Sequence, residues 1–184
     1  MQNGRDDNRL QNVAPTHIVP NGLRWTHCRQ LVFDAGNEYR KYEVLDTSHP
    51  TMGIDYIHWD GTAFQVYPFT EEPRPNYLYD QSALGAFYIR NSDNRENDIT
   101  AEYGYVNYRL RSQPLPEGVI IIDGQWTDSA SPAYTMTYDE SDELYHCRLL
   151  QKQGYYSYQY LWLSPTGKHR FLPSEGSYYQ TQNR

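Results

Sequence analysis

The stretch "GYYSYQYLWL", residues 154 to 163, holds five aromatic side chains in ten positions. Successive side chains of a β-strand point to opposite faces. One face of this strand therefore carries Tyr156, Tyr158, Tyr160 and Trp162. We expect that face to belong mainly to a protein core, and we expect Tyr155, on the other face, to be more exposed.

Similar short runs with alternating side chains recur along the chain, and no stretch shows a good helical period with capping residues. These runs are residues 31–33, 39–46, 54–60, 63–69, 85–91, 103–111, 118–123, 133–138 and 144–151. Turn residues separate them, and Asp60-Gly61 favours a tight hairpin because this pair tolerates positive φ. The pattern predicts an all-β protein with almost no helix.

The polar segment "NSDNRENDIT", residues 91–100, lies between two sets of predicted strands. We interpret it as a linker; calcium binding is the alternative, but Arg95 interrupts the spacing of ligands in an EF-hand loop. The sequence thus predicts two consecutive immunoglobulin-like β-sandwich domains, residues 1–100 and residues 101–184. The chain begins on a turn and stops where a strand pattern starts, so we expect the first domain to be N-terminally truncated and the second C-terminally truncated.

Composition indicates a folded chain with an aromatic core. Only 34 of the 184 residues are Leu, Ile, Val or Phe, but 19 Tyr and 4 Trp supply further apolar surface, and the net charge is only −7. The acidic balance, without a long Lys/Arg run, argues against a nucleic-acid partner or an anionic membrane surface. No apolar run approaches the roughly 20 residues of a membrane helix, so we expect no transmembrane segment.

The familiar signatures of reactive sites are missing from the sequence. It has no Gly-x-Ser-x-Gly turn, phosphate-binding Gly loop, His-Glu-x-x-His or Cys-x-x-Cys. The acidic pair Glu71-Glu72 and the run at 139–143 are alternatives as a glycosidase acid and nucleophile, although solvated carboxylates are the simpler interpretation. We therefore predict no catalytic residues and no cofactor.

The two cysteines, Cys28 and Cys147, each follow a histidine. A zinc site built from the two His-Cys pairs and a disulfide between the cysteines are both alternatives. Neighbouring residues on a strand point to opposite faces, which disfavours the zinc site, and we predict no metal. Buried free thiols are the favoured interpretation.

Two stretches in the second half of the chain resemble the early-set immunoglobulin-like modules attached to glycogen- and starch-active enzymes. They are "GVIIIDGQWTD" from residue 118 and "MTYDESDELYHCRLLQKQGYYSYQYLW" from residue 136. The resemblance implies that Tyr156, Tyr158 and Tyr160 face inward. It also motivates one alternative function, a carbohydrate-binding module with an oligosaccharide as its partner.

Nearly the whole chain resembles the plug protein family of the bacterial type IX secretion system. The matching stretches are, in order, "MQNGRDDN", "LVFDAGNEYRKYE", "YLYDQSALGAFYI", "YGYVNYRL", "LLQKQGYYSYQYL" and "EGSYYQTQN". The most specific pieces are residues 2–5, 35–40 and 152–156. The resemblance implies a longer protein with a signal peptide and another β-domain upstream.

The family resemblance also implies a role. The protein would be periplasmic and non-enzymatic, and it would associate with the outer-membrane translocon and close its periplasmic opening when no substrate is passing. Such a role needs a rigid body with an aromatic and polar docking face. We take Trp126, Tyr155 and Trp162 as candidate binding residues, for a protein partner or for a sugar.

Three further motifs have both a functional and a structural interpretation. In "AGNEYRKYE", an ion pair of Arg40 with Glu38 or Glu43 would hold a docking loop, but a simple turn is favoured. Trp126 is more simply a ring folded over the end of the sandwich. Trp59 is expected in the core.

Overall fold

The chain is described by a computed structural model that covers residues 9–32, 37–81, 83–128, 130–172 and 174. It is an all-β structure with 42% strand and 7% helix, as the sequence predicts. The strands are β1 (His17–Val19), β2 (Gly22–Arg24), β3 (Arg40–Val44), β4 (Ile54–Trp59), β5 (Phe64–Pro68), β6 (Phe87–Ile89), β7 (Tyr103–Arg111), β8 (Val119–Asp123), β9 (Thr137–Asp139), β10 (Leu144–Lys152), β11 (Gly154–Leu163) and β12 (His169–Phe171). The helical turns are η1 (Arg29–Leu31), α1 (Asn97–Thr100) and η2 (Pro132–Tyr134).

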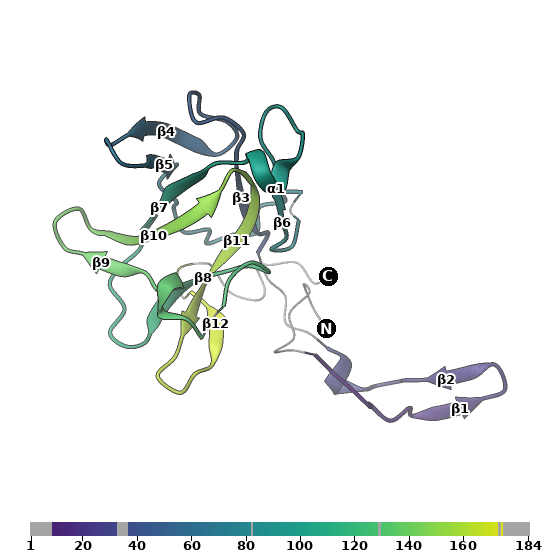
Figure 1. Cartoon of the computed structure of the whole chain (residues 1–184). Helices are drawn as coiled ribbons and strands as arrows, with labels where there is room; N and C mark the ends of the chain where they lie inside the picture. Colours follow the sequence, from purple (N-terminus) through teal and green to yellow (C-terminus); the bar gives the residue numbers. More distant parts are fainter. Residues whose placement is uncertain (1–8, 33–36, 82, 129, 173, 175–184) are drawn as a thin grey trace.

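Most strands belong to two sheets whose inner faces share one core, an arrangement consistent with a β-sandwich (Figure 1). The first sheet has the order β4-β5-β7-β10-β9, and its strands are antiparallel except for the parallel pair β5–β7. The second sheet is built around β11. Buried side chains from both sheets form one continuous cluster, so the sheets are stabilised by the same core.

Strand β11, the aromatic stretch Gly154–Leu163, is the centre of the second sheet. Its first half pairs with β3 and β6, and its second half pairs with β8 and β12. Tyr156 is thereby registered with Tyr42 on β3 and with Phe87 on β6. One strand thus holds four others in place.

The inward orientation predicted for three tyrosines of β11 is confirmed, although Ser157 and Leu161 on the opposite face are buried as well. Tyr156, Tyr158 and Tyr160 are buried, whereas Tyr155 is half-buried. The Tyr156 ring stacks on the Tyr42 ring at 5.5 Å between centroids and on the Phe87 ring at 6.1 Å. Rows of stacked rings across neighbouring strands stabilise a sheet, so the aromatic face of β11 is used mainly for packing.

Gly154 begins β11 at a position where a side chain has no room. A Cβ atom built on Gly154 would lie 2.4 Å from the carbonyl oxygen of Tyr88, far inside a normal contact. Glycine therefore permits the close approach of β6 to the start of β11.

The expected division into domains 1–100 and 101–184 is not confirmed, because strands from both sides of residue 101 share both sheets. From the N-terminal side, β3 and β6 pair with β11, and β5 pairs with β7. The segment 91–100 passes from β6 in the second sheet to β7 in the first. Hydrogen bonds from Ser92 N–H to the Leu45 carbonyl and from Gln153 N–H to the Glu102 carbonyl hold its ends against the sheets.

Several local predictions need correction. The predicted strand at 31–33 is wrong at its start, where residues 29–31 form η1, and the run at 133–138 begins in η2 before β9. The hairpin between β4 and β5 is confirmed, but its loop has four residues. The Asp60 carboxylate accepts hydrogen bonds from the N–H groups of Thr62 and Ala63, and only Gly61 has positive φ.

The hairpin β1–β2 was not predicted, and in the described part of the chain it pairs with no further strand. It lies away from the two sheets in Figure 1, and Ile18, Leu23 and Val32 of this segment are exposed. Residues 1–8, 33–36 and 175–184, which carry parts of the matching motifs quoted above, lie outside the described residues. No helix among the described residues has the length and apolar character needed to span a bilayer.

The buried tyrosines predict how stability depends on pH. Burial raises the pKa values of Tyr42, Tyr108 and Tyr158 well above 10, the ordinary value. Because the folded-state pKa values are raised, the stability that depends on keeping these hydroxyls neutral is fully present below pH 10. It is lost as the pH rises from 10 through the folded-state pKa values. We expect phenolate absorbance at 295 nm to rise in two steps: exposed tyrosines near pH 10, then buried ones together with loss of circular dichroism.

The urea-unfolded chain is the control for that titration, since all 19 tyrosines should then ionise in one step near pH 10. A folded chain whose tyrosines all ionise near pH 10 with unchanged circular dichroism would contradict this account of the core.

Candidate functional site

A cavity of about 670 Å³ opens where the two sheets meet the connection that follows β8. We call it the aromatic cavity because five rings line it. Its lining residues are Phe87, Ile89, Tyr103, Gln125, Trp126, Thr127, Asp128, Ala133, Tyr134, Leu149, Leu150, Gln151, Lys152 and Tyr156. A concave surface with apolar walls and a few polar groups is the usual form of a binding site.

Trp126 is held in the wall of this cavity by a short local motif. Its Nε1–H donates to the carbonyl oxygen of Ser157 on β11 at 3.0 Å. A Cβ atom on Gly124 would lie 2.7 Å from that Nε1 and 2.9 Å from the same carbonyl oxygen, so the bond needs glycine at this position. The Gly-x-Trp spacing therefore fixes the ring over the end of the sandwich, as the structural interpretation of Trp126 expects.

The rings around Trp126 meet it edge-on. Its ring plane is inclined by 74° to Tyr134 and by 81° to Tyr156, with centroids 6.2 Å and 5.3 Å away. Such a box of perpendicular rings encloses an inserted side chain better than it supports a flat sugar ring, which needs coplanar exposed faces.

Gln151 is the one polar side chain of the aromatic cavity that is at least nine-tenths buried, with 8% of its surface exposed. Its Oε1 accepts hydrogen bonds from the hydroxyls of Tyr42 at 2.6 Å and Tyr108 at 2.8 Å. Its Nε2 has no hydrogen-bond partner among the described residues. A buried donor without a partner costs about 1–3 kcal/mol, so an acceptor that reached this amide would bind favourably.

The structure does not bring the three candidate rings together. Tyr155 lies on the face of β11 opposite to Tyr156, and hence away from Trp126. Trp162 is near the other end of β11, where its Nε1–H donates to the Glu117 carbonyl and its ring packs on the core. Trp126 alone lines the aromatic cavity.

Two rings of β7 have a cationic side chain beside them. The Arg148 guanidinium lies 3.8 Å from the centroid of Tyr105, and the Lys152 ammonium lies 5.2 Å from that of Tyr103. Trp59, predicted in the core, is instead 55% exposed at the end of β4, where it contacts Phe64. Alternation along a strand does not show how far the opposing sheet covers that strand. This explains why Trp59 was wrongly predicted in the core.

The acidic and basic residues singled out in the sequence form structural pairs. Arg40, 4% exposed, is paired with Glu71 and donates to the Glu72 carbonyl at 2.9 Å, partners that the sequence analysis did not name, and Glu43 is paired with Arg90. The same Glu71 carboxylate accepts the hydroxyl of Tyr158 at 3.0 Å. Glu71 is therefore occupied by two partners.

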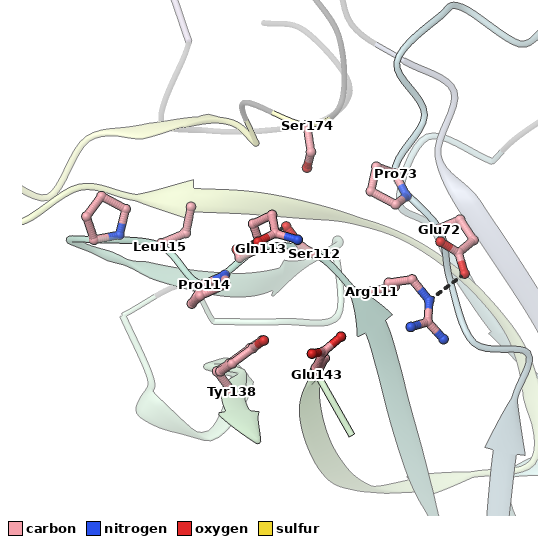
Figure 2. Close-up of a pocket in the computed structure, with 11 residues that line it drawn as sticks. Glu72, Pro73, Arg111, Ser112, Gln113, Pro114, Leu115, Tyr138, Glu143 and Ser174 are labelled. Atoms are coloured by element: carbon pink, nitrogen blue, oxygen red, sulfur yellow. Dashed lines mark hydrogen bonds and ion pairs between the residues drawn. The ribbon is translucent and has the colours of Figure 1, made fainter. Parts of the chain in front are cut away.

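A second cavity, of about 570 Å³, lies beside the connection between β7 and β8 (Figure 2). The Arg111 Nε–H donates to the Glu72 carboxylate at 2.9 Å on one side, and Pro114 and Leu115 line the other. Tyr138 and Glu143 face the same space. Among the described residues that line this cavity, the pairing of Glu72 with Arg111 leaves no pair of free carboxylates.

Near this cavity, His146 on β10 contacts both carboxylate oxygens of Asp142, at 2.9 Å and 3.1 Å. Asp139 completes a group whose metal-ligating atoms lie within 4.8 Å of one another. Backbone N–H groups of Ser141 and Leu144 already bind the two aspartates, and the Ser141 bonds hold the pKa of Asp139 below its ordinary value. These contacts are those of a tight turn between β9 and β10.

Both cysteines are free thiols, so the disulfide alternative is not formed. Burial raises the pKa of Cys147 to about 11, whereas Cys28 is only half-buried. We therefore expect iodoacetamide at pH 8 to label the folded chain once, at Cys28, because roughly one in a thousand Cys147 thiols is then ionised. Mass spectrometry of the Cys28→Ser variant should find no native labelling, and equal labelling of both cysteines would contradict the burial of Cys147.

No protein-family model and no curated protein matches the sequence. A solved structure is similar: the crystal structure of a hypothetical protein from Parabacteroides merdae ATCC 43184, with 34% sequence identity and a TM-score of 0.88. The match covers 98% of this chain and 47% of that one, so the chain spans about half the length of the similar protein. The similarity supports the all-β architecture described above.

The geometry around Trp126 predicts the effect of Gly124→Ala. The added methyl group would displace the Trp126 ring and break its bond to Ser157, lowering the free energy of unfolding by about 1–3 kcal/mol. Tryptophan fluorescence should shift to longer wavelength as the ring enters water. Trp126→Phe, which keeps Gly124 but replaces the indole by a smaller ring without the N–H donor, is the comparison for stability, and an unchanged spectrum and stability for Gly124→Ala would contradict this geometry.

Proposed function

We propose that this chain is part of a non-enzymatic plug protein of the type IX secretion system, which docks on the periplasmic side of an outer-membrane channel. The observation that carries the proposal is the ordered set of motifs along nearly the whole chain, from residues 2–5 through residues 152–156. The proposed location is the periplasm, in association with the outer membrane.

The arrangement of polar groups supports a binding role more than a catalytic one. The carboxylates proposed for glycosidase chemistry are engaged, Glu71 by Arg40 and Glu72 by Arg111. His146 is engaged by Asp142 in a turn. These groups stabilise the fold, and a stable β-body with apolar side chains on its surface suits docking.

The exposed apolar side chains supply the material for such a docking surface. They include Ile18, Val32, Trp59, Phe69, Leu78, Tyr79, Phe87 and Tyr88. Binding energy at protein interfaces is concentrated in a few aromatic and Arg residues. These positions, rather than Tyr155 and Trp162, are the better candidates for contact with a channel.

The finer fold belongs to the same proposal. We infer that β7 to β12 form an early-set immunoglobulin-like unit, since β7, β10 and β9 lie in one sheet and β8, β11 and β12 in the other. Strands β3 to β6 then extend both sheets. An oligosaccharide partner remains the competing proposal, but the perpendicular rings at Trp126 and the cations over Tyr105 and Tyr103 favour a protein partner.

Co-purification tests the docking role. The tagged chain is added to detergent-solubilised outer membranes of a bacterium that has the type IX system, and the captured proteins are identified by mass spectrometry. We expect the secretion channel to be captured, and we expect Trp59→Ala or Tyr79→Ala to weaken its retention by on the order of 2 kcal/mol with unchanged thermal unfolding. Glu140→Ala, at an exposed position between β9 and β10 that lines neither cavity, is the surface control.

Glycan arrays test the competing proposal of an oligosaccharide partner. Specific binding of an oligosaccharide, with no channel captured, would replace the docking proposal by the carbohydrate-binding one.

A further inference from the structure

Strand β6 has an open hydrogen-bonding edge. Among the described residues it pairs only with β11, where Arg90 N–H donates to the Gln153 carbonyl and Ser157 N–H donates to the Ala86 carbonyl. In an antiparallel pair, alternate residues make the ladder bonds and those between them point their backbone groups outward. The N–H and C=O groups of Phe87 and Ile89 therefore face away from β11.

This open edge borders the aromatic cavity. Phe87 and Ile89 both line the cavity, whereas Tyr88 between them points to the other face of the strand. Phe87 is 46% exposed, so β6 is accessible. A strand added beside β6 would present every second side chain on the same face as Phe87 and Ile89, that is, toward the cavity.

Gln151, which lines the cavity, has a buried amide nitrogen with no hydrogen-bond partner among the described residues. The Gln151 Oε1 is already occupied by the Tyr42 and Tyr108 hydroxyls, so the group that needs a partner is the donor Nε2. A ligand group that combines an aromatic ring with an oxygen acceptor matches both the ring walls and this amide. Among protein side chains, that description fits tyrosine.

We propose that the edge of β6 binds an extended segment of a partner protein as an added strand, with a tyrosine side chain in the aromatic cavity and its hydroxyl accepting from Gln151 Nε2. This inference rests on the docking role proposed above. The open backbone edge favours a polypeptide over a sugar, because an extended chain carries N–H and C=O groups at the same repeat as the outward groups of Phe87 and Ile89.

The probe is a capped heptapeptide, acetyl-Thr-Val-Thr-Tyr-Thr-Val-Thr-amide, titrated into the folded chain by tryptophan fluorescence. We expect saturable binding with a Kd below about 1 mM. Replacing the peptide tyrosine by phenylalanine, which removes the acceptor, should weaken binding about five- to tenfold. Methylating its backbone amides should abolish binding, because the added strand then lacks its donors.

Two protein variants test the two halves of the site. Ile89→Pro removes an N–H that points away from β11, so the chain should keep its circular dichroism while affinity falls at least about tenfold. Ala133→Trp fills the exposed side of the cavity and should have the same effect. Tyr88→Ser, on the opposite face of β6, is the matched control and should bind as the wild type does.

The inference is overturned by any of four results. The tyrosine peptide does not bind; it binds Ile89→Pro as well as it binds the wild type; maltotriose binds the wild type instead and fails to bind Ala133→Trp; or the chain forms a dimer that Ile89→Pro dissociates, which makes a second copy the occupant. Capture of the channel together with failure of the peptide would reject this site alone and leave the docking role standing.

Discussion

A core built from tyrosines must provide hydrogen-bond partners for the hydroxyls that it buries, and for Tyr42, Tyr108 and Tyr158 this constraint organises the structure. Tyr42 and Tyr108 share the Gln151 amide oxygen and lie 2.7 Å apart, oxygen to oxygen. Tyr158 donates to Glu71, whose negative charge is balanced by Arg40. A buried ion pair adds little net stability by itself, but losing either partner leaves an uncompensated charge. Rings and polar groups in this core therefore depend on one another, which gives it a specific geometry as well as apolar burial.

The same constraint ties the two halves of the chain together. Arg40 on β3 and Glu71 after β5 come from the N-terminal side, whereas Tyr158 lies on β11 near the C-terminal end. The Tyr42 hydroxyl on β3 reaches Gln151 on β10 across more than a hundred residues of sequence. A boundary near residue 101 would cut through these bonds as well as through both sheets. The polar composition of residues 91–100 reflects a connection between sheets, which has the same turn residues as a linker between domains.

The alternation of side chains was sufficient to predict the longer strands. It was insufficient to predict the short strands and the contacts between residues far apart in the sequence. The bounds of β7 are those predicted, and β10 and β11 differ from the prediction by one residue, because their alternation is sustained over nine or ten positions. The three-residue strands β1, β2 and β12 leave no comparable signal. The partner of Arg40 was missed since it lies 31 residues away, and two nearer glutamates looked equally suitable. Of the three candidate rings, Trp126 is the one that lines the aromatic cavity, and the Gly-x-Trp spacing was the signal for it.

The aromatic cavity follows from the way the core ends. Inside the sandwich, each tyrosine hydroxyl competes for a small number of acceptors, and Gln151 supplies its oxygen to two of them at once. Its amide nitrogen is then left at the margin of the core, where the stack of Tyr42, Tyr156 and Phe87 also ends. Beyond that point, β6 has no further strand beside it among the described residues. Three incomplete features thus occur together: the ring stack lacks a next ring, the Gln151 amide nitrogen lacks an acceptor, and strand β6 lacks a neighbouring strand. The same kind of ligand would complete all three. This convergence distinguishes the aromatic cavity from the cavity of Figure 2, whose charged groups Glu72 and Arg111 already bind each other.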